Sequence, residues 1–322
     1  MNTRAMWGAL VGDACGATLE FYDDEITKEI AQRAMTMPGG GSLRVGPGQI
    51  TDDGELTLAL WSVLRERDPA QGFPIEAVAK AYAAWYESFP FDIGRTCSLA
   101  FDALSDAIHD GNDLDGALGM IDDMSRRSEA NGALMRVTPI ATWWASRPRL
   151  IDGGVEETAR SAAAAADLDA RLSHPGLVTR DVNAVYVYAL TLLLLGCSPV
   201  ETAQRVDTMA RERCPEVRRW VEESKKEWEG LSDARVLIGH VRHAFVAALW
   251  FLRRPEIGYE EAICMVLQRG GDTDTNAAIV GGLVACYQPI PEAMKAAVMG
   301  FDCCVSGRPR PKDYGVKYQM GS

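Results

Sequence analysis

Residues 51–64 read TDDGELTLALWSVL, in which two acids stand directly before an apolar helical pattern. From Glu55 to Leu64 the apolar side chains recur at steps of three and four residues, the period of a helix that enters a core. The same order of acids followed by an apolar helix returns at residues 270–287, GGDTDTNAAIVGGLVACY. Both stretches predict buried helices whose first turns are acidic.

Helical periodicity extends over the rest of the chain. Alternating runs of β-branched residues are nearly absent, so the sequence predicts an all-α fold. Short turns marked by Pro, Gly, Asp or Ser separate the helices, and no Gly/Ser- or Pro-rich linker divides the chain. We therefore expect residues 1–322 to form one compact domain. The predicted helices cover residues 55–64, 75–86, 96–109, 155–170, 180–195, 200–211, 216–229, 238–251, 260–267 and 276–287.

Composition and charge argue against several classes of function. The net charge is −12 and the pI about 4.9, and no run of Lys and Arg could neutralise nucleic-acid phosphates. No stretch of 18 apolar residues predicts a membrane span, and the apolar segment near the N-terminus is too short for a signal peptide. The eight cysteines form no CxxC pair, which is typical of reduced thiols in a cytosolic protein. We expect a cytoplasmic monomer without nucleic-acid partners.

Two clusters of acids and hydroxyls, Thr51-Asp52-Asp53 and Asp272-Thr273-Asp274-Thr275, stand at predicted helix starts. Thr and Asp are favoured N-caps, and acids suit the positive end of a helix, so capping explains either cluster alone. Two carboxylates in each are more than capping requires, and four carboxylates brought together repel unless cations lie between them. Ligands that are all oxygen select hard ions such as Mg²⁺, Mn²⁺ or Ca²⁺. The spacing leaves paired caps and a metal site equally open.

Residues 12–21, GDACGATLEF, contain two acids inside an apolar segment. Gly12 and Gly16 are four residues apart, which suits the close packing of two helices. Asp13 and Glu20 could pair, bind a ligand or have raised pKa values. Taken alone, this segment favours the simpler interpretation that both acids are half-exposed and capped.

Asn131-Gly132 and the histidines are weaker candidates. Asn-Gly predicts a tight turn, and a loop whose backbone N–H groups hold a phosphate is the alternative. His174 lies in a connector and is the best functional candidate among the four histidines. His240 and His243 share one face of a predicted helix without an acidic partner at ligand spacing, so we interpret them as structural or surface residues.

Six segments, taken in order, resemble the ADP-ribosylglycohydrolase family: GDACGATLEF, PGQITDDGELTLAL, DIGRTC, ANGALMR, LSHP and GGDTDTNAAIVGGL. Each motif alone is weakly specific, whereas the ordered set is specific and spans most of the chain. The stretch MTMPGGGSLRVGPGQITDD is especially similar to the bacterial dinitrogenase reductase-activating branch, whose members hydrolyse ADP-ribosyl-arginine.

The resemblance implies an all-α, orthogonal multi-helix fold with a binuclear centre of Mg²⁺ or Mn²⁺. The residues that match the family's metal ligands are Thr51, Asp52, Asp53, Asp272, Asp274 and Thr275. The candidates for catalysis are Glu20, Asp92 and Asp53. The residues that match the substrate-binding positions are Asn131, Gly132, Met135 and His174.

The implied activity is hydrolysis that releases ADP-ribose from modified protein side chains. The branch resemblance favours the N-glycosidic bond of ADP-ribosyl-arginine, while serine-linked, polymeric and O-acetyl ADP-ribose are alternatives. A non-catalytic binding or structural member of the family is a second interpretation, and a phosphohydrolase acting on the diphosphate is a third. The chain departs from the family's usual Thr at Gly54 and usual Gly at Ala130. We expect Gly54 to loosen its helix start and Ala130 to restrict the Asn131 loop.

Overall fold

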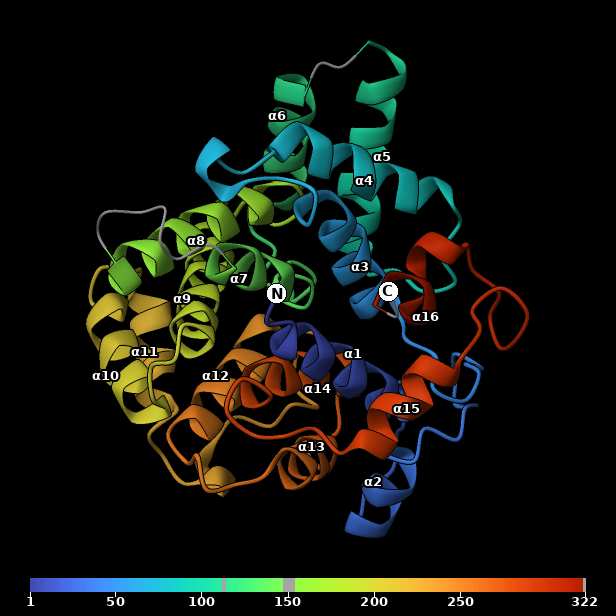
Figure 1. Ribbon diagram of the computed structural model, residues 1–322, viewed down its shortest axis with the longest axis vertical. Helices are drawn as coiled ribbons and strands as arrows, with labels where there is room; N and C mark the ends of the chain where they lie inside the picture. The colour runs from blue at the N-terminus through green and yellow to red at the C-terminus, as the bar shows by residue number, and fades with distance from the viewer. Residues whose placement is uncertain (112–113, 147–153, 321–322) are drawn as a thin grey trace.

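Two helices from opposite ends of the chain form the centre of the molecule. The structure is a computed structural model that describes residues 1–111, 114–146 and 154–320. α1 (Arg4–Gly16) and α14 (Thr273–Val284) lie side by side (Figure 1). A Cβ atom added to Gly12 would lie 2.1 Å from the carbonyl oxygen of Ala277, and one added to Gly16 would lie 2.4 Å from the Cα of Asp274. The close packing predicted from Gly12 and Gly16 is confirmed.

The remaining α-helices surround this pair. Within the described ranges the backbone forms no strand, only the isolated bridges Gly40–Val45 and Ala130–His240, so the prediction of an all-α fold is confirmed. The helices are α2 (Lys28–Ala34), α3 (Asp52–Leu64), α4 (Ile75–Glu87), α5 (Arg95–His109), α6 (Leu114–Ser125), α7 (Thr138–Ala145), α8 (Gly154–Arg171), α9 (Leu177–Leu194), α10 (Pro199–Ala210), α11 (Pro215–Glu223), α12 (Val241–Leu252), α13 (Tyr259–Leu267), α15 (Glu292–Gly300) and α16 (Val316–Gln319). Short 3₁₀ turns are η1 (Pro69–Gln71), η3 (Trp228–Gly230) and η4 (Lys312–Tyr314).

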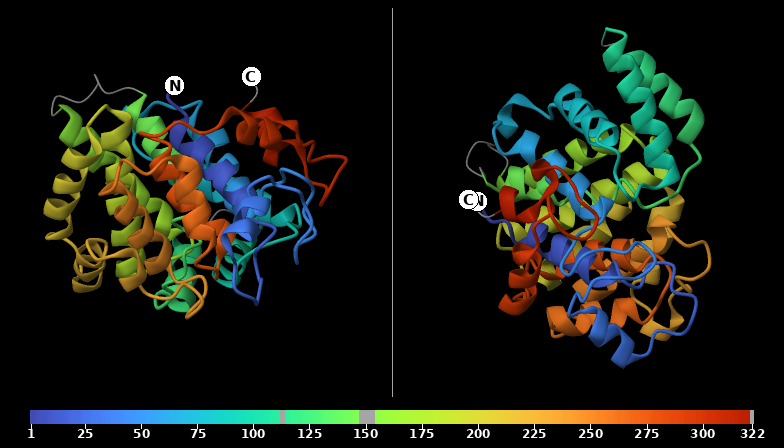
Figure 2. Two further views of the ribbon diagram at one scale, coloured as in Figure 1. Left: turned by 90° about the horizontal axis from the view of Figure 1, so that it is seen from below. Right: turned by 90° about the vertical axis from the view of Figure 1, so that its right-hand side faces the viewer.

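Neighbouring helices in the chain pack against the central pair in groups. α12 and α13 contact α14, whereas α3 and α7 contact α1. α8 and α9 pack along each other, and α7 joins them to the centre. The α5–α6 pair projects from the body, and both chain ends lie on the same side of the molecule (Figure 2). The starts of α3 and α14 therefore meet beside the end of α1.

Some helix boundaries differ from the sequence prediction. α3 and α14 begin at Asp52 and Thr273, three residues earlier than predicted, so the acids belong to the first helical turn. The helix predicted over residues 216–229 is too long, because α11 ends at Glu223. The carbonyl of Lys226 accepts hydrogen bonds from Trp250 Nε1 and from Arg254, both at 3.0 Å. These tertiary contacts replace the helical bond that the carbonyl would otherwise make.

α9 is the most apolar long helix in the part of the chain that the structure describes. Its length and its mean hydropathy of 1.3 would suffice for a membrane span, but 78% of it is buried within the fold. This burial is typical of a core helix. All eight cysteines are free thiols in the structure, in agreement with the prediction from their spacing.

Candidate active site

Asp13 in α1 holds the first turn of α3. Its carboxylate accepts hydrogen bonds from Thr51 N at 3.0 Å, Thr51 Oγ1 at 3.0 Å and Gly54 N at 2.9 Å. Thr51 occupies the N-cap position, but its side chain does not cap its own helix. The interpretation of Asp13 as a half-exposed cap is wrong: α1 and α3 close over this carboxylate completely. Burial raises the pKa of Asp13 to about 7, although the bonds from Thr51 and Gly54 oppose the shift.

The start of α14 is also not capped by its own side chain. Asp272 is the N-cap residue by position, yet it makes no cap bond. Instead its Oδ2 accepts a hydrogen bond from Asn131 Nδ2 at 2.8 Å. Thr275 Oγ1 donates to Asp53 Oδ2 at 3.1 Å, which joins the two acidic helix starts. Simple capping therefore does not explain these side chains.

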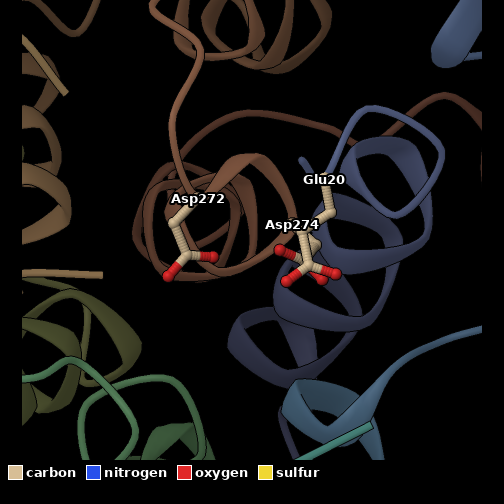
Figure 3. Close-up of side chains that lie close together, drawn as sticks. All are labelled: Glu20, Asp272 and Asp274. Carbon is tan, nitrogen blue, oxygen red and sulfur yellow. The ribbon is translucent and has the colours of Figure 1, made fainter. Parts of the chain in front are cut away.

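Three carboxylates converge where α1 ends and α14 begins. One oxygen from each of Glu20, Asp272 and Asp274 lies within 4.8 Å of the other two. Figure 3 shows the three side chains directed into the same space. Among the described residues this is the one cluster of three acids, cysteines or histidines with such spacing.

Burial and mutual repulsion disfavour the ionised forms of these acids. Burial, followed by the charges of Asp92, Asp272 and Asp13, raises the pKa of Glu20 to about 9. Burial and the charge of Asp272 raise the pKa of Asp92 to about 6. The pKa values of Asp52, Asp53 and Asp274 are also raised, first by burial and then by neighbouring carboxylates. Protein groups alone do not compensate this much negative charge at neutral pH.

The donor atoms fit a hard divalent cation. Glu20 Oε2 and Asp53 Oδ1 are buried oxygens without a hydrogen-bond partner. A buried acceptor left unpaired costs free energy, and a bound cation removes that cost. The surrounding ligands are carboxylates and hydroxyls, the set that Mg²⁺ and Mn²⁺ prefer. Glu20, Asp272 and Asp274 could hold one cation, and Asp52, Asp53 and Thr275 lie beside them.

A cavity of about 260 Å³ opens beside this cluster. It is lined by all the sequence-predicted site residues except Thr51 and Asp53, which lie behind its wall. The predicted residues that line it are Glu20, Asp52, Asp92, Asn131, Gly132, Met135, His174, Asp272, Asp274 and Thr275. The structure thus brings together segments that are separated by more than two hundred residues in the sequence.

His174 and the Asn131 loop form another wall of the cavity. His174 is fully buried, its Nδ1 contacts Ser173 Oγ at 2.9 Å and its Nε2 has no partner. Burial and the nearby Arg136 charge lower the pKa of His174 to about 3, so the ring is neutral. The predicted turn is present, since Leu134 N donates to the Asn131 carbonyl at 2.8 Å. Asn131 and Gly132 of this turn also line the cavity.

Arg136 is a residue that the sequence motifs did not identify as part of the site. It supports the Asn131 loop from the interior of the protein. It is fully buried and donates to the carbonyl of Gly132 at 3.0 Å and to Asp169 at 3.1 Å. Its guanidinium also lies 4.5 Å from the centre of the Tyr82 ring. The signal that could have identified it is a single arginine among the apolar residues of the stretch 133–137.

His240 is the N-cap residue of α12 and not part of the helix as predicted, and it has an acidic partner from another segment. Its Nε2 lies 3.1 Å from Glu129 Oε2, and its backbone pairs with Ala130. Glu129 belongs to a segment far away in the sequence. This contact fixes the entrance to the Asn131 loop.

The two departures from the family pattern have local explanations. A Cβ atom on Gly54 would lie 2.7 Å from Asp13 Oδ2 and 2.8 Å from Ile50 Cβ. Glycine therefore lets Asp13 approach α3, which begins regularly at Asp52 without the expected loosening. Ala130 joins the isolated bridge to His240, so its backbone is held by a neighbour.

The profile of the ADP-ribosylglycohydrolase family matches residues 3–307. A putative ADP-ribosyl glycohydrolase, L543, of Acanthamoeba polyphaga mimivirus is 27% identical over 314 residues, covering 92% of this chain and 90% of its own.

Two bacterial relatives have more specific names. The ADP-ribosyl-[dinitrogen reductase] glycohydrolase of Rhodospirillum rubrum is 36% identical over 160 residues, which cover 48% of this chain and 49% of that protein. The ADP-ribosylarginine hydrolase Tri1 of Pseudomonas putida (strain GB-1) is 25% identical over 289 residues, covering 87% and 68%.

The fold is also similar to that of a solved structure. A chain described as part of an ADP-ribosylglycohydrolase-related protein complex superposes with a TM-score of 0.69 at 24% identity, covering 91% of this chain and 90% of that chain. At this identity the likeness concerns the arrangement of helices.

Proposed function

This chain belongs to the ADP-ribosylglycohydrolase family, and from that premise we propose that it is a metal-dependent hydrolase of ADP-ribosylated proteins. The proposed linkage is the N-glycosidic bond of ADP-ribosyl-arginine, and the proposed cofactors are two divalent cations, Mg²⁺ or Mn²⁺. The observation that carries the proposal is the convergence of buried carboxylates with unpartnered oxygens at the wall of a cavity.

Cleavage at C1 of the ribose develops positive charge on the sugar. When bound, divalent cations would orient the ribose hydroxyls and polarise a water molecule. Glu20, Asp272 and Asp274 would hold one cation, and Asp52, Asp53, Thr51 and Thr275 would complete the ligand set. Asp92, which lines the cavity outside this ligand set, would stabilise a cationic sugar as a carboxylate, because opposite charges interact strongly where water is excluded.

Asp92 is the best placed candidate for proton transfer. It lines the cavity, and its pKa of about 6 is close to the range in which a carboxylate can both accept and return a proton at neutral pH. Glu20, which lines the cavity, and Asp53, which lies behind its wall, remain candidates for catalysis. Asn131, Gly132, Met135 and His174 would position the ADP-ribose, with the neutral His174 ring offering Nε2 to a hydroxyl or phosphate oxygen.

The arginine linkage is supported by two observations. A relative of this chain is an ADP-ribosylarginine hydrolase by name, although its identity to this chain is 25%. The cavity wall is strongly acidic, which suits a leaving group that is a guanidinium. Serine-linked, polymeric and O-acetyl ADP-ribose are the alternative substrates, and a non-catalytic ADP-ribose-binding role is the alternative function.

The decisive experiment is release of ADP-ribose from an arginine-ADP-ribosylated protein, after EDTA treatment and with Mg²⁺ or Mn²⁺ restored. Metal-dependent release of intact ADP-ribose with unmodified arginine is the expected result. Release of AMP would identify a phosphohydrolase instead. Release only from serine-linked or polymeric substrate would change the linkage, and binding of ADP-ribose without release from any substrate would favour a non-catalytic member.

We also propose that residues 1–322 act as one domain, as a monomer, in the cytoplasm. The negative charge supports the absence of nucleic-acid partners. Light scattering tests the monomer, since a mass near twice 35.1 kDa would contradict it. Fractionation of cells that produce the protein tests the location.

A further inference from the structure

Large apolar side chains are exposed on three connections that lead to the acidic cavity. We call them the apolar collar: Phe21, Tyr22, Phe89, Val236, Leu237 and Ile238. Phe89 is 89% exposed and Leu237 is 72% exposed. The collar contains every exposed large aromatic side chain in the ranges that the structure describes. Exposed apolar side chains that lie around one cavity commonly mark an interaction site.

Each part of the collar lies close to the cavity. Phe21 follows Glu20 and lines the cavity itself. Phe89 is three residues from Asp92, so at no more than about 3.6 Å per residue it lies within roughly 11 Å of that carboxylate's backbone.

Leu237 is similarly close to the start of α14. It is two residues before Gly239, whose carbonyl accepts from Asn131 N at 2.9 Å. A Cβ atom on Gly239 would lie 3.4 Å from Asp272 Oδ2. The chain from Leu237 therefore runs directly to the cavity wall.

Backbone geometry sets the collar apart from ordinary exposed residues. Phe21, Phe89 and Leu237 have φ angles of 59°, 54° and 56°, in the left-handed region that bulky side chains rarely adopt. Five non-glycine residues have positive φ in the described chain, and three of them belong to the collar. Strained backbone tends to cluster at functional sites. These side chains gain no burial in exchange for the strain.

We propose that the apolar collar docks the folded surface of the ADP-ribosylated protein around its modified side chain. The inference rests on the proposed function and names its substrate class: folded proteins with apolar surface beside the modification, in preference to small ADP-ribosyl compounds. An extended arginine places its guanidinium roughly 6 Å from its Cα, given bonds of about 1.5 Å. When the scissile bond reaches the acids, the target's Cα atom therefore lies roughly 6 Å from the guanidinium, close to the connections that carry Phe21, Phe89 and Leu237.

The test compares one modified protein with free ADP-ribosyl-arginine as substrates of the same enzyme. The double variant Phe89→Asn, Leu237→Asn removes collar side chains while Asn tolerates the left-handed backbone. We expect kcat/KM for the modified protein to fall about ten-fold or more, through KM, as for loss of interface anchors. We expect kcat/KM for free ADP-ribosyl-arginine to stay within about two-fold, since neither side chain lines the cavity.

The matched control is Met120→Gln, Val200→Gln, which removes two exposed apolar side chains from α6 and α10. It should leave both substrates unaffected. Equal losses on both substrates, or no loss on the protein, would overturn the collar proposal while leaving the proposed function intact. A wild-type dimer that the collar variant converts to monomer would assign the collar to a second copy and also overturn it. If the wild-type protein hydrolysed neither substrate, the proposed function would be contradicted. The collar proposal, which rests on that function, would then be contradicted as well.

Discussion

Asp13 accepts three hydrogen bonds from the first turn of α3, and the placement of Asp52 and Asp53 depends on those bonds. It does not line the cavity, so its effect on the site is indirect. It takes the part that the helix's own N-cap residue, Thr51, would otherwise play. A residue of this kind positions ligands without touching the substrate.

Asp13→Asn should weaken this arrangement. An amide has one oxygen, and its NH₂ group would face the donors on Thr51 or Gly54, leaving a buried donor unpaired. We expect the free energy of unfolding to fall by about 1–3 kcal/mol, as measured by urea denaturation. Asp24→Asn, at an exposed carboxylate, is the control and should change stability by less than about 0.5 kcal/mol. Equal effects of both changes would rule out the positioning role.

Asp274→Ala should remove cation binding and hydrolysis together while the fold survives. The side chain belongs to the cluster of three acids, and its removal also relieves repulsion in the metal-free protein. The melting temperature with and without Mn²⁺ measures binding, and circular dichroism measures helix content. A variant that kept full metal-dependent turnover would show that the two acidic helix starts do not form the metal centre.

At the scale of helices, the α1–α14 contact brings the two ends of the chain together. Gly8, Gly12 and Gly16 form a strip on α1 that lets the α14 backbone approach. The contact places Asp274 beside the end of α1, and so determines its distance from Glu20. The three glycines thus allow the close helix packing on which the positions of the acids depend.

Gly12→Ala should disturb that geometry, because its Cβ would lie 2.1 Å from the Ala277 carbonyl oxygen. We expect a loss of about 1–3 kcal/mol, or more, from forced backbone shifts, together with weaker cation binding in a calorimetric titration. Gly119→Ala in α6 is the control, since its Cβ would meet nothing within 4 Å. That change should stabilise the protein by up to about 1 kcal/mol. If both substitutions stabilised, the helix crossing would not be close-packed.

The segment after residue 307 is joined to α3 by a buried ion pair. Arg310 Nε donates to Glu55 Oε1 at 2.9 Å, and its side chain also reaches the Ser88 carbonyl at 2.8 Å. Trp85 Nε1 donates to the same Glu55 carboxylate at 2.7 Å. The segment that contains Arg310 thus also holds α3, the helix that carries Asp52 and Asp53.

Arg310→Ala should cost about 3–5 kcal/mol, because it leaves Glu55 buried without a counter-charge. Guanidinium denaturation measures the change. The double variant Arg310→Ala, Glu55→Gln should recover part of the loss, since the uncompensated charge is then gone. Full additivity of the two single losses would show that the ion pair does not couple these segments.

The helices of this fold follow from apolar periodicity, but the site depends on contacts that periodicity does not contain. Residues 55–64 and 276–287 predict α3 and α14, yet the acids that precede them enter the first turn because Asp13 and Asn131 hold those turns from elsewhere in the chain. The six ordered motifs identified most of the residues that line the cavity. Arg136 and the Glu129–His240 pair were missed, since their partners are distant in sequence.

At the scale of the whole molecule, the buried acids predict a pH dependence of stability. Ordinary Asp and Glu titrate near pH 4 in an unfolded chain, whereas the folded-state pKa values are about 6 for Asp92, about 7 for Asp13 and about 9 for Glu20. The folded state therefore binds more protons than the unfolded state between these values. These acids therefore make the metal-free protein less stable as pH rises from about 4 to about 9, whereas the lowered pKa of His174, about 3, opposes this effect only below about pH 6.5.

A bound divalent cation should oppose this loss, since it favours the ionised carboxylates. We expect the melting temperature in EDTA to fall between about pH 6.5 and pH 9, where the histidines no longer contribute, and the gain on adding Mn²⁺ to grow over the same range. Differential scanning calorimetry at several pH values measures both. A metal-free melting temperature that rose steadily with pH would contradict the raised pKa values of the cluster.

The packing of α1 against α14 can form only late in the synthesis of the chain. Glu20 leaves the ribosome about 250 residues before Asp274, which corresponds to roughly 13 to 50 s at synthesis rates of about 5–20 residues per second. During that interval α1 lacks the helix against which its glycines pack. A nascent chain that stops before α14 lacks Asp274 and cannot complete the cluster of three acids, so incomplete translation products are expected to be inert.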